Sequence, residues 1–162
     1  QCSNFVTRLA ETLASYPEIP PELLELEILE TSAIEDVEQV SGLMNTCLHM
    51  GVKFALDDFG TGYSSLTYLK RLPANVLKID QSFVRDMLID TSDLEIVKAV
   101  IGLADIFNRG VIAEGVETKA HGQKLLSLNC VIAQGYGISR PMPADDFPLW
   151  LEQWHINPIW VA

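Results

Sequence analysis

The sequence predicts an α/β fold in which helices cover a parallel sheet. Short apolar or β-branched segments alternate with segments of helical periodicity, which is typical of βα units. The short segments are continuously apolar, as expected for strands that are covered by helices. Most of them run into acidic residues, so acidic side chains are expected at one edge of the sheet.

Five strands and six helices are expected in alternation. The strands are predicted at 24–28, 52–56, 76–79, 111–113 and 131–133. The helices are predicted at 3–15, 34–50, 64–71, 93–107, 119–128 and 144–154. The helix at 93–107 has the clearest periodicity, because Leu94, Val97 and Ile101 fall on one stripe. Thr91 or Ser92 is expected to cap it.

The length of the chain limits the architecture. With 162 residues it is expected to form one domain, residues 1–162. A closed barrel of eight βα units typically needs about 250 residues. Two interpretations remain: a small open α/β domain, or a barrel whose first strands are absent. The chain opens with Gln1 and not with methionine, so we expect it to be part of a longer protein.

Charge and cysteine content exclude several classes of protein. The net charge of −11 disfavours binding to nucleic acid or to an anionic lipid surface. The three cysteines lie far apart and form no Cys-x-x-Cys pair, which disfavours a zinc site or a disulfide framework. No apolar segment reaches the roughly 20 residues of a membrane span. We therefore expect a cytoplasmic protein.

Charged and polar side chains lie in the last residues of the five predicted strands or shortly after them. They are Glu27 and Glu30, Asp57 and Asp58, Lys78 and Asp80, Glu114 and Glu117, and Gln134. The carboxyl ends of parallel strands form the edge of an α/β fold where ligands bind. Carboxylates crowded there would repel one another, and hard divalent cations such as Mg²⁺ or Mn²⁺ would relieve the repulsion. Lys78 would suit an anionic substrate or an attacking water.

Taken singly, each of these residues also has an ordinary structural interpretation. Asp57 and Asp58 could form a helix cap and turn, and Lys78 could belong to a common salt bridge. The segment Gly60-Thr61-Gly62 matches no phosphate-binding loop and is interpreted as a turn. The tryptophans are interpreted as packing residues. The placement of so many acids at strand ends is what favours a site.

Five ordered motifs resemble the EAL domain family of cyclic di-GMP phosphodiesterases. They are Leu-Glu-Ile-Leu-Glu-Thr at 26–31, Asp-Asp-Phe-Gly-Thr-Gly-Tyr-Ser-Ser-Leu at 57–66, Leu-Lys-Ile-Asp at 77–80, Ala-Glu-Gly-Val-Glu-Thr at 113–118 and Gln-Gly-Tyr at 134–136. The resemblance covers nearly the whole chain and implies a TIM-type barrel. It also implies hydrolysis of cyclic di-GMP to linear pGpG, assisted by two Mg²⁺ or Mn²⁺ ions.

The resemblance implies a role for each matching residue. Metal ligands would be Glu27, Asp57, Asp58 and Glu114, and catalytic residues Lys78 and Glu114. Gln134, Tyr136 and Pro141 would contact the substrate. Glu30 would stabilise the loop 59–65, which in the family is associated with dimerisation, so a homodimer through this loop is expected. Glu117 is expected to be structural.

The family motifs Glu-Ala-Leu and Asn-x-Ser are absent from the sequence. By the resemblance, the chain holds the last five strands of a barrel and lacks the first three, and at least two metal ligands with them. This piece alone is then expected to be inactive. A GGDEF or PAS-type domain often precedes EAL domains. Two alternatives remain open: a degenerate EAL domain that binds cyclic di-GMP or a protein without hydrolysis, and a self-contained five-stranded interaction domain.

Overall fold

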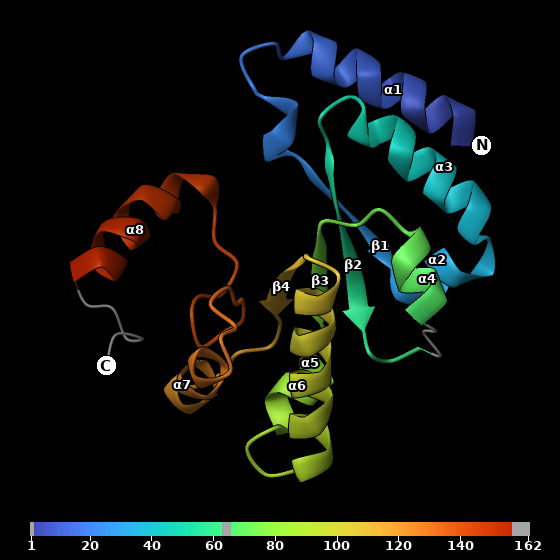
Figure 1. The fold of residues 1–162 in the computed structure, drawn as a ribbon. Helices are drawn as coiled ribbons and strands as arrows, with labels where there is room; N and C mark the ends of the chain where they lie inside the picture. Colours follow the sequence, from blue (N-terminus) through green and yellow to red (C-terminus); the bar gives the residue numbers. More distant parts are fainter. Residues whose placement is uncertain (1, 63–65, 157–162) are drawn as a thin grey trace.

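A four-stranded parallel sheet forms the centre of the molecule (Figure 1). The computed structural model describes residues 2–62 and 66–156. The strands are β1 (Glu25–Leu29), β2 (Lys53–Phe59), β3 (Val76–Ile79) and β4 (Gly110–Ala113). Their order in the sheet is β1-β2-β3-β4, and every neighbouring pair is parallel. Consecutive parallel strands joined by helices confirm the predicted α/β fold and correspond to part of a barrel.

Helices follow the strands along the chain. They are α1 (Cys2–Ser15), α2 (Glu30–Glu35), α3 (Val37–Leu48), α4 (Leu66–Arg71), α5 (Gln81–Asp86), α6 (Thr91–Ile106), α7 (Lys119–Ser127) and α8 (Phe147–Ile156). Two 3₁₀ helices, η1 (Pro21–Leu23) and η2 (Ala144–Asp146), precede β1 and α8. In Figure 1, α1 and α3 lie at the β1–β2 end of the sheet and α8 beyond β4. Among the described residues, no helix is long and apolar enough to cross a membrane.

The core lies between the central strands and the helices that cover them. β2 and β3 contribute the fully buried Phe54, Leu56 and Leu77, and α6 adds Val97 and Val100. The side chains of β1 are at most half-buried, because β1 has a neighbouring strand on one side only among the described residues. The two central strands therefore hold the sheet together.

The predicted elements differ from the structure in several places. Asp90, and not Thr91 or Ser92, caps α6 by accepting a hydrogen bond from Ser92 N. The predicted helix at 34–50 is interrupted, because Asp36 caps α3 by accepting a hydrogen bond from Gln39 N. β2 continues three residues beyond its predicted end, to Phe59. The helix α5 was not predicted, since six residues are too few to show a helical period. The predicted strand at 131–133 is reduced to one bridge, Ala113 to Ala133.

Two glycines allow the last two chain segments to touch at the backbone. A Cβ on Gly135 would lie 2.3 Å from Val116 N, and one on Gly137 would lie 2.4 Å from the carbonyl carbon of Glu117. Backbone hydrogen bonds cross the same contact, from Val116 N to Gln134 O (3.0 Å) and from Gly137 N to Val116 O (2.8 Å). These bonds continue the pairing that the single bridge begins, so the segment 134–137 stays attached to the end of β4.

We predict that Gly137→Ala lowers the free energy of unfolding by about 1–3 kcal/mol, because the new methyl group would overlap backbone atoms that cannot move aside. The matched control is Gly102→Ala in α6, where a Cβ meets nothing within 4 Å. Alanine is the better helix former, so the control should be about 0.5–1 kcal/mol more stable than the wild type. Urea unfolding of both variants measures the difference, and equal stabilities would contradict the close approach.

Candidate active site

The Lys78 ammonium joins three carboxylates at the carboxyl end of the sheet. Lys78 Nζ lies 2.7 Å from Glu27 Oε1, 2.8 Å from Asp57 Oδ1 and 2.7 Å from Glu114 Oε1. The three acids come from β1, β2 and the residue after β4, while Lys78 itself lies on β3. Its side chain is 5% exposed. Parallel pairing in this register brings acids from three segments that are distant in the sequence to the buried charge on β3.

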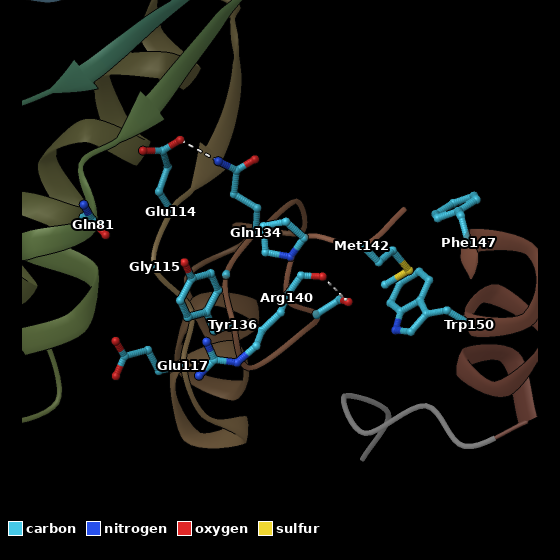
Figure 2. Close-up of a pocket in the computed structure, with 13 residues that line it drawn as sticks. Gln81, Glu114, Gly115, Glu117, Gln134, Tyr136, Arg140, Met142, Phe147 and Trp150 are labelled. Carbon is cyan, nitrogen blue, oxygen red and sulfur yellow. Dashed lines mark hydrogen bonds between the residues drawn. The ribbon is translucent and has the colours of Figure 1, made fainter. Parts of the chain in front are cut away.

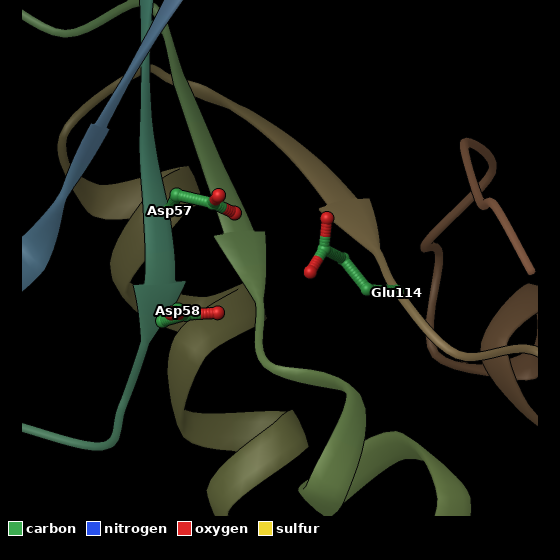
Figure 3. A group of neighbouring side chains, drawn as sticks. All are labelled: Asp57, Asp58 and Glu114. Carbon is green, nitrogen blue, oxygen red and sulfur yellow. The ribbon is translucent and has the colours of Figure 1, made fainter.

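Asp57 and Asp58 both face this site because β2 is irregular at its end. Neighbouring side chains of a regular strand point to opposite faces of the sheet. Here the pairing of β2 with β3 shifts between Leu56 and Phe59, and Asp58 has a φ of 53°. Asp tolerates this left-handed conformation better than most residues. As Figure 3 shows, the bulge places the Asp57 and Asp58 side chains on the side that also carries Glu114.

Burial and neighbouring charges shift the pKa values of Asp58, Glu114 and Lys78. The pKa of Asp58 is raised by burial and then by the neighbouring charges of Asp57 and Asp80. Burial also raises the pKa of Glu114, although Lys78 opposes this shift. Burial alone would lower the pKa of Lys78, but its ion pairs with three carboxylates outweigh burial and raise it. Lys78 stays charged, and the carboxylates exceed the positive charge available to them.

The donor set fits a divalent cation. Asp57, Asp58 and Glu114 offer carboxylate oxygens that all lie within 4.8 Å of one another. Asp57 Oδ1 is buried, and among the described residues it has no partner in hydrogen-bond geometry, although Lys78 lies at ion-pair distance. Oxygen-only donors with surplus negative charge suit hard cations such as Mg²⁺, Mn²⁺ or Ca²⁺. Glu27 is outside this group of three and is held through Lys78.

Glu30 holds the loop that follows β2. This residue begins α2 and is 2% exposed, and its Oε2 accepts a hydrogen bond from Gly60 N at 2.9 Å. A Cβ on Gly62 would lie 2.8 Å from Glu30 Oε1, so the carboxylate fits closely against the loop. The remaining part of the predicted loop, 63–65, lies outside the described residues.

A cavity of about 580 Å³ opens beside the acidic cluster (Figure 2). Glu114 and Gln134 lie at one end of it, where Gln134 Nε2 donates a hydrogen bond to Glu114 Oε1 at 2.7 Å. At its wall the Arg140 guanidinium lies 4.6 Å from the centre of the Tyr136 ring. Pro141 adds to the lining. The cavity thus combines flat apolar surface with positive charge next to the carboxylates.

The structure brings all the predicted site residues to this end of the sheet, and it adds some that the sequence analysis did not select. Arg140 stacks on Tyr136. A substrate contact was predicted for the next residue, Pro141, but none for Arg140. Trp150 was interpreted as a packing residue, but it also lines the cavity and stacks on Phe147 at 5.7 Å. Asp80, which was predicted among the strand-end acids but given no role, approaches Asp58 and caps α5 by accepting a hydrogen bond from Ser82 N. Its position directly after β3 was the signal for it.

Comparison with known proteins assigns the chain to a family. Residues 1–141 match the family model of the EAL domain. The bifunctional diguanylate cyclase/cyclic di-GMP phosphodiesterase MucR of Pseudomonas aeruginosa is 44% identical over 127 residues, which are 78% of this chain and 18% of that protein. The chain belongs to the EAL domain family. It spans about a fifth of the length of such relatives.

Solved structures agree with this assignment. A structure of the PaMucR phosphodiesterase in complex with c-di-GMP superposes with a TM-score of 0.84 at 41% identity, over 88% of this chain and 57% of that one. BlrP1 of Klebsiella pneumoniae, in a complex with manganese and c-di-GMP, gives a TM-score of 0.77 at 33% identity over 84% of this chain and 34% of that one. The described residues therefore have the fold of part of an EAL barrel, and the match covers 57% of the PaMucR chain.

We predict that Asp58→Asn stabilises the metal-free protein by about 0.5–2 kcal/mol at neutral pH, because asparagine keeps the backbone conformation and removes a repelled charge. The pKa of Asp58 is raised in the folded state. Below the ordinary carboxyl pKa the side chain is protonated in both the folded and the unfolded state, so it does not lower the free energy of unfolding there. As pH rises from the ordinary carboxyl pKa to the raised pKa, the side chain ionises first in the unfolded state, and the free energy of unfolding falls. The advantage of the variant should therefore vanish in acid.

Thermal unfolding between acidic and neutral pH measures this difference, with and without Mn²⁺. Glu11→Gln on the exposed face of α1 is the control for loss of one negative charge, and it should show no comparable pH-dependent gain. Mn²⁺ should stabilise the wild type and Glu11→Gln more than Asp58→Asn. A gain for Asp58→Asn that persists in acid would contradict electrostatic repulsion as its cause.

Proposed function

We propose that the chain forms the catalytic carboxyl-terminal part of a cyclic di-GMP phosphodiesterase domain, which hydrolyses one phosphodiester bond to yield linear pGpG. The observation that carries the proposal is the buried Lys78 among carboxylates from three strands, next to the close group Asp57, Asp58 and Glu114. Two relatives that match this chain, MucR and NbdA of Pseudomonas aeruginosa, are described as cyclic di-GMP phosphodiesterases, and PaMucR is solved with c-di-GMP bound. Each of these findings supports the same reaction.

Asp57, Asp58 and Glu114 would hold the divalent cations, with Glu27 as a further ligand. The bound cations supply neutralisation of phosphate charge and a lowered pKa of water. Lys78 orients the carboxylates and donates to an anionic oxygen near the attacking water. Glu114, whose pKa is raised, accepts the proton of that water as its oxygen bonds to phosphorus. The bond from phosphorus to the ribose 3′ oxygen breaks, and that oxygen takes up a proton.

The adjoining cavity suits the purine of the substrate. Tyr136, with Arg140 stacked on it, and Pro141 present flat surfaces on which a base can stack. Gln134 lies between this surface and Glu114, so a nucleotide bound here would place its phosphate toward the carboxylates. With a net charge of −11, binding of an anionic ligand requires bound cations or positioned basic side chains, such as Lys78 and Arg140, at the site.

We further propose Mg²⁺ or Mn²⁺ as the cation. BlrP1 has been solved with c-di-GMP in the presence of manganese and also of calcium. Ca²⁺ accepts longer and more numerous oxygen contacts than Mg²⁺ or Mn²⁺, so we expect it to bind without supporting the reaction efficiently.

The proposal includes the assembly of the domain. Strands carrying Glu-Ala-Leu and Asn-x-Ser motifs would precede residue 1, complete the barrel and supply further metal ligands. The loop that Glu30 holds would contribute to a homodimer. The protein would act in the cytoplasm, in bacterial second-messenger signalling, with a GGDEF or PAS-type domain upstream. MucR is itself described as bifunctional, with both cyclase and phosphodiesterase activity.

We predict that Lys78→Met in the complete EAL domain lowers the kcat for c-di-GMP about 10²–10³-fold, because the carboxylates lose the ammonium that fixes them and an oxygen loses its donor. Lys98→Met is the matched control, since among the described residues Lys98 pairs only with the exposed Glu95. Separation of c-di-GMP from pGpG after incubation with Mg²⁺ or Mn²⁺ measures turnover. Residues 1–162 alone should show none.

Each other outcome of this assay has a defined meaning. If the complete wild-type domain binds c-di-GMP without hydrolysing it, the catalytic proposal is wrong and the domain is a receptor. If it neither binds nor hydrolyses it, the carboxylates are structural and an interaction module is the remaining interpretation. Full activity of Lys78→Met would overturn the role given to Lys78 while leaving the reaction intact.

A further inference from the structure

His121 is buried between two helices outside the acidic cluster. It lies in the first turn of α7 and is 6% exposed. Its Nε2 lies 3.0 Å from the backbone oxygen of Arg85 in α5, and its Nδ1 lies 2.8 Å from Thr118 Oγ1. Both ring nitrogens therefore have a partner, and the partners belong to different βα units.

The partners determine the tautomer of the ring. The Arg85 carbonyl oxygen can only accept, so Nε2 carries the hydrogen and donates it. Nδ1 of the neutral ring then accepts the hydroxyl hydrogen of Thr118. The same Thr118 oxygen accepts the backbone N–H of His121 at 3.4 Å, as the cap of α7. The imidazole is held in one orientation from both sides.

The two helices that His121 joins follow the two segments that carry Lys78 and Glu114. α5 begins two residues after the strand that bears Lys78, and α7 follows the loop 114–118 that begins with Glu114. At the other end of that loop, Gly115 lies against α5, where a Cβ would come within 2.6 Å of Gln81 Cβ. The loop therefore contacts α5 near both of its ends. Gly115, its second residue, lies against Gln81, and His121, three residues after the loop, binds the backbone of Arg85.

Further contacts of the loop fix it to β3 and to the segment 134–137. Glu114 N donates to Ile79 O at 3.2 Å, and Val116 N donates to Gln134 O at 3.0 Å. These bonds set the height of Glu114 along the sheet. The hydrogen bond of His121 adds a contact from the side of α5, so the loop is held both at the sheet and at this helix.

We infer that His121 is a positioning residue, which holds the loop 114–118 against α5 so that the Glu114 carboxylate stays in contact with Lys78 and Gln134. The inference rests on the proposed function for its effect on turnover, because His121 does not touch the reacting groups. Displacement of a catalytic group by about 1 Å can cost 10²-fold in rate, so a residue of this kind would matter.

The test compares three variants of the complete EAL domain. His121→Leu fills much of the space without a hydrogen bond, and His121→Gln keeps an N–H donor of comparable reach. Leu125→Ala is the control, since Leu125 is 1% exposed in the same helix and serves packing alone. The measurements are kcat and KM for c-di-GMP at saturating Mn²⁺, the affinity for Mn²⁺ by calorimetry, and amide hydrogen exchange of residues 114–118.

We expect His121→Leu to lower kcat or Mn²⁺ affinity about 10–100-fold, as substitution of residues behind metal ligands does, and to speed exchange in 114–118. His121→Gln should restore most of both. Leu125→Ala should lower the melting temperature while keeping kcat at temperatures where it is folded. If His121→Leu does not fold, His121→Asn replaces it, because its amide is one carbon shorter than that of glutamine and should fail to reach Arg85.

The inference is overturned if the hydrogen-bond-deficient variant keeps wild-type kcat, Mn²⁺ affinity and exchange, or if Leu125→Ala loses kcat to the same extent. Failure of the proposed function is a different result. In that case the wild type itself does not hydrolyse c-di-GMP, and His121 is judged by Mn²⁺ affinity and by hydrogen exchange in 114–118 alone.

Discussion

One buried ammonium group organises this structure. Lys78 sits on a central strand, with carboxylates from the two strands before it and from the segment after β4. A buried charge is tolerated only when its partners are in place, and a partner lost from one strand leaves the others uncompensated. The register of all four strands is therefore coupled to one ion cluster. The same cluster leaves more negative than positive charge at the sheet edge, which is the condition that a divalent cation relieves.

The site depends on departures from regular geometry as well as on charge. A regular β2 would direct Asp57 and Asp58 to opposite faces, and only the bulge and the left-handed Asp58 bring both to one side. Bulges next to active sites commonly redirect a side chain in this way. Gly135 and Gly137 also allow an unusual geometry, since they let the backbone of the segment 134–137 lie directly on that of the loop after Glu114. The conformational cost is borne by a rigid sheet behind the site.

A second layer of polar residues supports the first. Glu30 holds the loop after Asp58 through Gly60 N, Gln134 binds Glu114 directly, and His121 ties the helix after Glu114 to α5. None of these contacts is strong alone. Together they restrict the loops that carry the carboxylates of the candidate metal site. Such support holds side chains of the right kind in the right geometry.

The sequence by itself determined the α/β class, four of the strands, the acids at the strand ends and, through five motifs, the family. These features are local in the chain, so periodicity and spacing reveal them. Tertiary structure decided the rest. The fifth predicted strand is a single bridge, and α5 is too short to leave a periodic signal. Trp150 lines the cavity because the fold brings α8 to the same cavity as Tyr136. The orientation of Asp58 and the contact between His121 and Arg85 arise from pairing across the fold. Contacts between residues some thirty positions apart follow from packing and hydrogen bonding of the whole sheet, which no local pattern encodes.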